Sequence, residues 1–166
     1  MSPVMEEKII EVNMAQMEIS QAPARLVTRG LGSCLGITLY DASRKAGGMS
    51  HPMLPDIEKS RIKSNPSRFV NSAIRKMVDE LQKQGSSKNQ LVAKIFGGAH
   101  MFGFIASDSI LNVGQKNVEV AQTVLKELGI EIVCQETGGS FGRTIELSLE
   151  TGKVLVKTVS WGEKEV

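Results

Sequence analysis

Two amphipathic helical patterns, with strand-like segments on either side, are the feature of this sequence that most restricts its fold. The first pattern covers 66–84, where Asn65 or Ser64 suits the amino-terminal cap and Gly85 suits the position after the helix ends. Its apolar residues recur at helical spacing and need a sheet or another helix to cover them. They are Phe69, Val70, Ala73, Ile74, Met77, Val78 and Leu81.

A second helix is predicted over 113–128, with Gly129 as its stop and one apolar face formed by Val118, Ala121, Val124, Leu125 and Leu128. The remaining segments alternate apolar and polar residues or form short apolar runs between turn residues, as strands do. The predicted strands are 7–14, 23–28, 35–41, a run around 47–51, 91–96, 130–134, and a hairpin formed by 143–149 and 153–159. We therefore predict one α/β domain that spans residues 1–166.

Composition and charge narrow the classes of protein to which this chain can belong. At 166 residues and 41% hydrophobic content, it can bury roughly two-thirds of its unfolded surface in one core. Its 20 basic and 18 acidic residues are interleaved, so no strong field is expected to attract nucleic acid. The densest basic stretch, Lys59, Arg61, Lys63 and Arg68, is interpreted as a solvated loop. The amino terminus has neither a signal peptide nor a membrane span, which predicts a cytoplasmic protein without membrane insertion.

Cys34 and His51 are the residues with the clearest chemical potential. Two cysteines are too few for a disulfide framework, so each can be considered as a nucleophile. If a hairpin turn is centred on Ala42 and Ser43, Cys34 lies directly opposite His51, with Cβ atoms about 4.5–5.5 Å apart. A bulge in the hairpin would shift this register by one residue. A neighbouring imidazolium would hold the cysteine as a reactive thiolate at rest.

Residues in this region could also serve the further steps of a cysteine-dependent hydrolysis. His51 would protonate departing ammonia and then activate the water that hydrolyses a thioester. Gly30 and Gly32 let the backbone turn, so that amide N–H groups at Gly32 and Ser33 face the developing oxyanion. The alternative interpretation is structural, because a lone cysteine is usually a small buried hydrophobe and a lone histidine a surface or hydrogen-bonded residue.

Other patterns favour structural interpretations. Gly30 and Gly32 miss the dinucleotide-binding spacing, and Gly138–Gly142 fits a nucleophile elbow only formally, because a strand-like segment follows it where a helix is needed. His100 has no cysteine or acidic cluster nearby at metal-ligand spacing. Cys134, in an apolar strand, is interpreted as an inert core thiol. We therefore predict no metal site and no cofactor.

Five ordered segments resemble the CheD family of chemotaxis proteins. They are TRGLGSC, GGMSHPMLP, KIFGGAHMF, NVGQKNVE and ETGGSFGRTIELSLETGKV, and the resemblance runs from about Leu26 to Val156. It implies a three-layer fold of helices and two packed sheets, similar to the deamidase domain of cytotoxic necrotising factor toxins. His100 departs from the family pattern, which has a small polar residue at this position.

The resemblance also implies an activity, roles and partners. Cys34 would be the nucleophile, His51 its acid–base partner, and Thr28 a residue whose oxygen accepts a hydrogen bond from the imidazole and orients it. The reaction would be that of a protein-glutamine glutaminase, converting specific glutamines of methyl-accepting chemotaxis receptors to glutamate. A CheC-type phosphatase is implied as a regulatory partner. Two alternatives stay open: a non-catalytic module that docks to receptors or to such a phosphatase, and an amidase for free amino acids.

Overall fold

The computed structural model describes residues 6–100 and 112–166. These residues form two five-stranded sheets and two α-helices. The strands are β1 (Lys8–Glu11), β2 (Met17–Gln21), β3 (Ala24–Leu31), β4 (Leu35–Asp41), β5 (Ala46–Ser50), β6 (Leu91–Gly97), β7 (Glu131–Thr137), β8 (Arg143–Ser148), β9 (Val154–Thr158) and β10 (Gly162–Glu165). The helices are α1 (Val70–Lys83) and α2 (Val113–Glu127), with short 3₁₀ turns η1 (Ile57–Lys59), η2 (Pro66–Arg68) and η3 (Lys88–Gln90).

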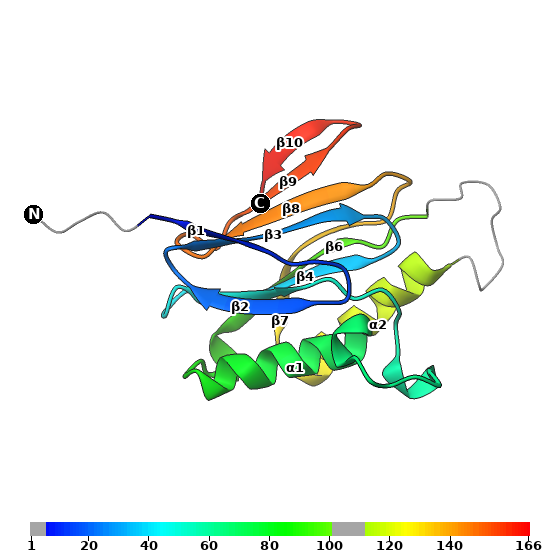
Figure 1. Ribbon diagram of the computed structural model, residues 1–166, viewed down its shortest axis with the longest axis horizontal. Coiled ribbons are helices and arrows are strands. Elements are labelled where there is room, and N and C mark those ends of the chain that lie inside the picture. The colour runs from blue at the N-terminus through cyan, green and yellow to red at the C-terminus, as the bar shows by residue number, and fades with distance from the viewer. Residues whose placement is uncertain (1–5, 101–111) are drawn as a thin grey trace, which may run out of the picture.

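The elements stack in three layers (Figure 1). The outer sheet has the strand order β1-β3-β8-β9-β10, and the central sheet has the order β2-β5-β4-β6-β7. Both sheets are mixed, because β1 pairs in parallel with β3 and β6 in parallel with β7. The helices cover one face of the central sheet, and the outer sheet covers the other. The predicted α/β class with two sheets and two principal helices is confirmed.

Strand β4 shows how the sequence specifies these layers. Leu35, Ile37 and Leu39 lie in the core between the central sheet and the helices, whereas Tyr40 lies in the core between the sheets. A side chain at Gly36 would meet Ile145 of the outer sheet, with its Cβ 2.6 Å from Cδ1. Every residue of β4 is therefore buried, so this strand requires apolar or small side chains on both faces.

Both predicted helices are present, but the first begins four residues later than predicted. Asn65 caps the 3₁₀ turn η2, where its side chain accepts from the Ser67 N–H, and α1 begins only at Val70. Both predicted stops hold, since Gly85 and Gly129 adopt φ of +109° and +71°, values that favour glycine.

Two edge strands, β2 and β10, were not predicted. β2 lies at an edge of the central sheet and was expected to be a polar connection between strands. β10 is fully exposed and pairs only with β9 at the edge of the outer sheet. β2 has a short alternation at Met17 and Ile19, which pack against the core, whereas β10 has no buried residue by which alternation could reveal it.

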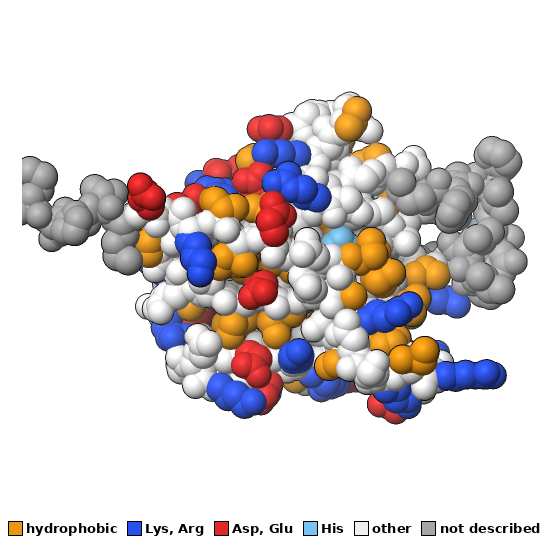
Figure 2. Space-filling model, viewed as in Figure 1, with side chains coloured by type: hydrophobic (Ala, Val, Ile, Leu, Met, Phe, Trp, Pro, Cys, Tyr) orange, Lys and Arg blue, Asp and Glu red, His pale blue; other side chains and the backbone are white. Residues whose placement is uncertain are grey.

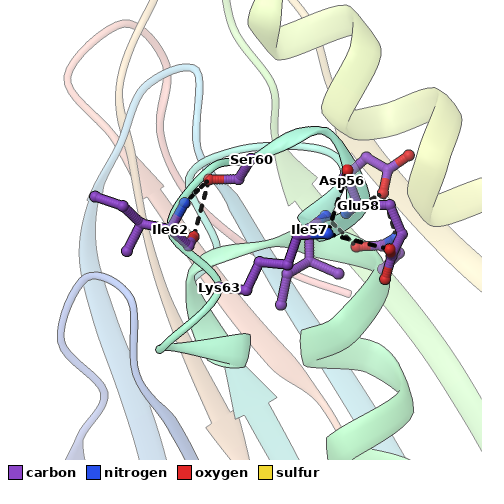
Figure 3. A network of polar contacts seen from close by, with 7 residues as sticks. Asp56, Ile57, Glu58, Ser60, Ile62 and Lys63 are labelled. Carbon is purple, nitrogen blue, oxygen red and sulfur yellow. Dashed lines mark hydrogen bonds and ion pairs between the residues drawn. The ribbon is translucent and has the colours of Figure 1, made fainter.

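The loop between β5 and α1 contains the basic stretch. Its base is closed by backbone hydrogen bonds from Met53 and Leu54 to the Arg68 carbonyl, at 2.8 and 3.1 Å. Within it, Asp56 accepts from the Glu58 N–H, and Glu58 pairs with Lys63 at 3.2 Å (Figure 3). The four basic residues are exposed, as expected of a solvated loop. No helix in the described part of the chain is long and apolar enough to cross a membrane.

Charge is spread over the surface. On the face shown in Figure 2, basic and acidic side chains both occur across the molecule. Pairs such as Arg75–Glu127 and Lys45–Glu150, each at 2.7 Å, match opposite charges locally. This arrangement agrees with the interleaving of charges in the sequence.

Candidate active site

His51 directly follows β5, and its side chain is buried between the two sheets with only 1% exposure. Its backbone is fixed on both sides, because its carbonyl accepts from the Ala15 N–H at 2.8 Å and its N–H donates to the Gln16 carbonyl at 3.1 Å. The turn before β2 thus holds the histidine in place. This turn lay in the segment that was expected to be an unstructured polar connection.

Thr28 of the outer sheet meets His51 across the interlayer, with 2.7 Å between Oγ1 and Nδ1. The same hydroxyl donates to the Val12 carbonyl at 2.6 Å. A hydroxyl has only one hydrogen, so Thr28 must accept from Nδ1–H of a neutral imidazole. Hence the ring proton lies on Nδ1, and the lone pair lies on Nε2. The predicted contact with Thr28 is present, whereas the Val12 carbonyl had no side-chain signal by which to be found.

Burial keeps the imidazole neutral. The pKa of His51 is lowered from 6.5 to about 4, because removal from water disfavours the charged form. Nε2 is buried and has no hydrogen-bond partner among the residues the structure describes. The uncharged ring with its fixed tautomer has a free lone pair on Nε2 that can accept a proton during a reaction, although its low pKa makes it a weak base at rest.

Cys34 lies at the amino-terminal end of β4, but the predicted register with β5 is wrong by two residues. The strands pair Ile37 with Ser50 and Asp41 with Ala46, because the turn between them contains four residues instead of two. A shift of two preserves the alternation of faces, so Cys34 and His51 still project from the same side of the sheet. They become diagonal neighbours, a separation of about 7–8 Å that side chains can span.

The Cys34 thiol is half-buried, and burial raises its pKa, an effect opposed by a hydrogen bond from its own backbone N–H. The predicted Cys34–His51 hydrogen bond is not formed in this structure, since Nε2 is unpaired. The pKa directions of both residues favour a neutral thiol and a neutral imidazole in the free protein, in contrast to the resting thiolate that the sequence predicts. Desolvation by burial is the first cause of the pKa shift of each group.

Three successive carbonyl groups hold the backbone around Cys34. The Gly32 carbonyl accepts from the Ala99 N–H at 2.9 Å, the Ser33 carbonyl from the Asn117 amide at 2.9 Å, and the Cys34 carbonyl from the Gly98 N–H at 3.0 Å. In the part of the chain that the structure describes, the N–H groups of Ser33 and Cys34 donate to no other residue. The Ser33 N–H is therefore a free amide donor near the thiol, whereas the Cys34 N–H bonds its own sulfur.

Gly30 forms part of a bulge that aims this segment. It adopts φ +70°, and the pairing of β3 with β8 shifts between Thr28 and Leu31. The extra residue allows both Thr28 and Leu31 to point into the interlayer. Gly30 therefore bends the chain as part of a β-bulge.

Comparison with known proteins places this chain in a family. The model of a family described as CheD chemotactic sensory transduction matches residues 53–158. A probable chemoreceptor glutamine deamidase CheD of Caldanaerobacter subterraneus subsp. tengcongensis is 43% identical over 162 residues, covering 98% of this chain and all of the relative. The chain belongs to the CheD family.

A second CheD relative and one solved structure complete the comparison. The probable chemoreceptor glutamine deamidase CheD 1 of Methanosarcina acetivorans is 40% identical over 158 residues, 95% of this chain and 97% of its own length. The crystal structure of the Bacillus licheniformis hypothetical protein YfiH is similar with a TM-score of 0.47 and 16% identity, over 73% of this chain and 49% of that one.

The remaining sequence candidates of this CheD family member lie apart from Cys34 and His51 or have structural roles. Gly47 and Gly48 do not turn the chain: they lie inside β5, where a Cβ at Gly47 would be 2.4 Å from the Leu39 carbonyl oxygen. Cys134 is half-buried on the edge strand β7, where it packs against the core between the two sheets. The loop Gly138–Gly142 leads into β8, as its interpretation as a loop requires.

His100 lines a cavity of about 300 Å³ beside the first turn of α2. The backbone N–H of His100 donates to the Gly139 carbonyl at 2.8 Å. Within residues 6–100 and 112–166, no three histidine, cysteine or acidic side chains are grouped as a metal site would require.

Asn117 is the residue near the site that the sequence analysis missed. It is fully buried on α2, and its side chain donates to the carbonyls of Ser33 and Met53. Its position was a usable signal, because it lies four residues before Ala121 on the otherwise apolar face of the helix.

Proposed function

We propose that this chain is a chemoreceptor glutamine deamidase, a protein-glutamine glutaminase that uses Cys34 as nucleophile and His51 as general base and acid. The observation that carries the proposal is the Thr28–His51 contact, which leaves a neutral, buried Nε2 on the same face as the Cys34 thiol. The names of the CheD relatives supply the substrate class. The substrates would be glutamine side chains on methyl-accepting chemotaxis receptors.

In the first half of the reaction, the thiol attacks the carbonyl carbon of the glutamine amide. As the S–C bond forms, the thiol proton passes to Nε2 and the carbonyl oxygen becomes an oxyanion. The amide N–H groups of Cys34 and Ser33, together with the turn at Gly32, would stabilise that oxyanion. The neutral resting pair suits this step, because proton transfer and attack occur together and no charged group has to be kept buried beforehand.

In the second half, the imidazolium returns the proton to the amide nitrogen, and the C–N bond breaks to release ammonia. A buried imidazolium with a pKa near 4 is a strong acid, so it readily gives its proton to the leaving group. His51 then accepts a proton from water, whose oxygen attacks the thioester. The tetrahedral intermediate collapses to glutamate, and the sulfur regains its proton from His51.

Thr28 orients the ring throughout these steps. Its hydroxyl is held by the Val12 carbonyl, so it can only accept from Nδ1–H, and Nε2 always faces the thiol side. A threonine adds no charge, which leaves the imidazole free to gain and lose a proton.

The substrate class can be tested by size. A receptor cytoplasmic fragment, a short glutamine-containing peptide and free glutamine would be incubated at equal concentration, with ammonia release measured and glutamine-to-glutamate conversion of about 1 Da followed by mass spectrometry. Contacts remote from the reacting amide position it, so the fragment should react far faster than the peptide or free glutamine. Equal rates for all three would favour the amino-acid amidase, and Cys34→Ala supplies the blank.

A second candidate function is a non-catalytic module that docks to receptors or to a CheC-type phosphatase. The unformed Cys34–His51 hydrogen bond favours it, because a structural cysteine needs no such bond. No conversion of any receptor fragment, with Cys34 unreactive to alkylation, would support this candidate. In either case we infer one domain over residues 1–166, a cytoplasmic location, a CheC-type partner and a fold like that of the toxin deamidases.

A further inference from the structure

The pairing of β4 and β5 ends where Cys34 and His51 lie. The last backbone hydrogen bond between the two chain segments runs from the Leu35 N–H to the Pro52 carbonyl at 3.2 Å. Proline has no N–H, so Pro52 cannot return a bond to the facing segment. The Ser33 and Met53 carbonyls lie one on each side of this end of the pairing. Neither accepts a hydrogen bond from the facing segment, so each needs another donor.

One amide group supplies both donors. Nδ2 of Asn117 lies 2.9 Å from the Ser33 carbonyl oxygen and 3.1 Å from the Met53 carbonyl oxygen. Both partners can only accept, so the nitrogen of the side chain must face them. Asn117 has 0% exposure, and its Oδ1 is buried without a partner among the described residues. Such an unpaired oxygen is unfavourable, and the two hydrogen bonds that Nδ2 donates offset this cost.

We propose that Asn117 is a positioning residue that sets the distance between the Cys34 thiol and the His51 imidazole. Ser33 precedes Cys34, and Met53 follows His51 by two residues, so the amide ties together the two segments that carry the reacting groups. The other two bonds of this loop, from Ala99 and Gly98, link the Cys34 side to β6 and the residues after it. Only Asn117 joins the Cys34 segment to the His51 segment through a side chain, as far as the described residues show.

This inference rests on the proposed function for its effect on turnover, but the geometry is testable without it. In the wild type, His51→Ala should change the rate and pH dependence of Cys34 alkylation by iodoacetamide, because the imidazole accepts the thiol proton. In an Asn117→Ala background, His51→Ala should change that rate and pH dependence little, because the two groups are no longer held together. Asn117→Asp should behave like Asn117→Ala, since it keeps the shape but removes the NH₂ group.

Turnover gives the second measurement. Misplacement of a reacting group by about 1 Å can reduce the rate about 100-fold, so Asn117→Ala and Asn117→Asp should lower kcat by about that factor with little change in KM. The control is Tyr40→Phe, which removes a buried hydrogen bond to the Leu149 carbonyl at 2.8 Å. Tyr40 lies near the opposite end of β4, about 20 Å along the strand from Cys34. This variant should keep both the kcat and the His51-dependent alkylation.

Each result decides the proposal. His51→Ala could alter alkylation equally in the wild-type and Asn117→Ala backgrounds, or have no effect in the wild type. In either case Asn117 does not set the distance between the thiol and the imidazole, and the inference fails. If Tyr40→Phe lowered kcat and the His51-dependent alkylation as much as Asn117→Ala does, the inference would also fail, because a general loss of stability would then explain both results. Loss of the coupling in Asn117→Ala, without deamidation by any variant or the wild type, would support the positioning role and refute the proposed function.

Discussion

The surroundings of the two cysteines differ in one respect that decides their chemistry. Cys34 and Cys134 are both half-buried, and burial raises the pKa of both thiols. Cys34 shares a face of the central sheet with a buried imidazole whose free nitrogen can accept a proton. Cys134 instead lies among charges of both signs: Glu136 raises its pKa further, whereas Lys94 and Lys164 lower it. Burial alone therefore does not distinguish the two cysteines, and the proposal of Cys34 as nucleophile rests on the buried imidazole that shares its face of the sheet.

The two regions also differ in how they are assembled. The charges around Cys134 lie on β7 itself, on the adjacent strand β6 and on β10. The region of Cys34 and His51 combines Val12, Thr28, Gly98 and Asn117, which come from four separate segments. Several of its polar atoms stay unpaired, as is common where structure serves a reaction. The contrast predicts that substitutions near Cys34 affect turnover and that matched ones near Cys134 do not.

The largest effect is expected for the two cysteines themselves. Cys34→Ala should reduce deamidation of a receptor fragment by at least about 10⁴-fold, because no other group can form the thioester. Cys134→Ser should keep activity within about twofold, since this thiol takes no part in the proposed reaction. Mass spectrometry of the fragment at matched protein concentration measures both. An essential Cys134 together with a dispensable Cys34 would reverse the assignment of the nucleophile.

The next largest effect on turnover is expected for His51, the proposed general base. His51→Ala should lower kcat about 10³-fold, the range expected of one general acid–base group. The loss should not add to that of Cys34→Ala, because residues that act as a unit are non-additive. The test is a double-mutant cycle on kcat. Losses that multiply fully in the double variant would show that the two residues work separately.

A smaller effect is expected for the orienting residue. Thr28→Val keeps the shape of the side chain but removes the acceptor for Nδ1–H, so the ring can rotate and kcat should fall about 100-fold. Thr28→Ser keeps the hydroxyl and should recover most of the activity. A Thr28→Val variant as active as the wild type would mean that packing between the sheets, and not this hydrogen bond, holds the ring.

Alternation of side chains explains why the sequence could place Cys34 and His51 on one face. The error in turn length moved the register by two residues, and an even shift leaves every side chain on its original face. The same reasoning could not give the distance between the two groups. That distance depends on the four-residue turn, on Pro52 and on Asn117, and no periodicity reports these.

The protonation states of Cys34 and His51 were the least predictable property of the site. A cysteine near a histidine suggests an ion pair when only the two residue types are known. The structure adds the layers above and below, and these bury His51 to 1% exposure and shift its pKa to about 4. Likewise, the tautomer is set by the Val12 carbonyl, a backbone atom that any residue at that position would supply. Desolvation and backbone acceptors emerge only from packing, so sequence patterns could not reveal them.

The smallest expected effect concerns stability against acid and tests the neutral state of His51 directly. The histidine has a pKa near 6.5 in the unfolded chain and about 4 in the folded protein, so the unfolded state binds more protons between these values. The free energy of unfolding therefore falls as pH decreases through this window, by about 2 kcal/mol between about pH 7 and pH 5. His51→Gln cannot take up this proton, so its stability should decline less, whereas the control Tyr40→Phe should follow the wild-type slope. Denaturant unfolding at a series of pH values measures the difference. Parallel curves for wild type and His51→Gln would mean that the folded protein accepts a proton on His51 near its ordinary pKa, and an imidazolium beside Cys34 would then restore the resting thiolate.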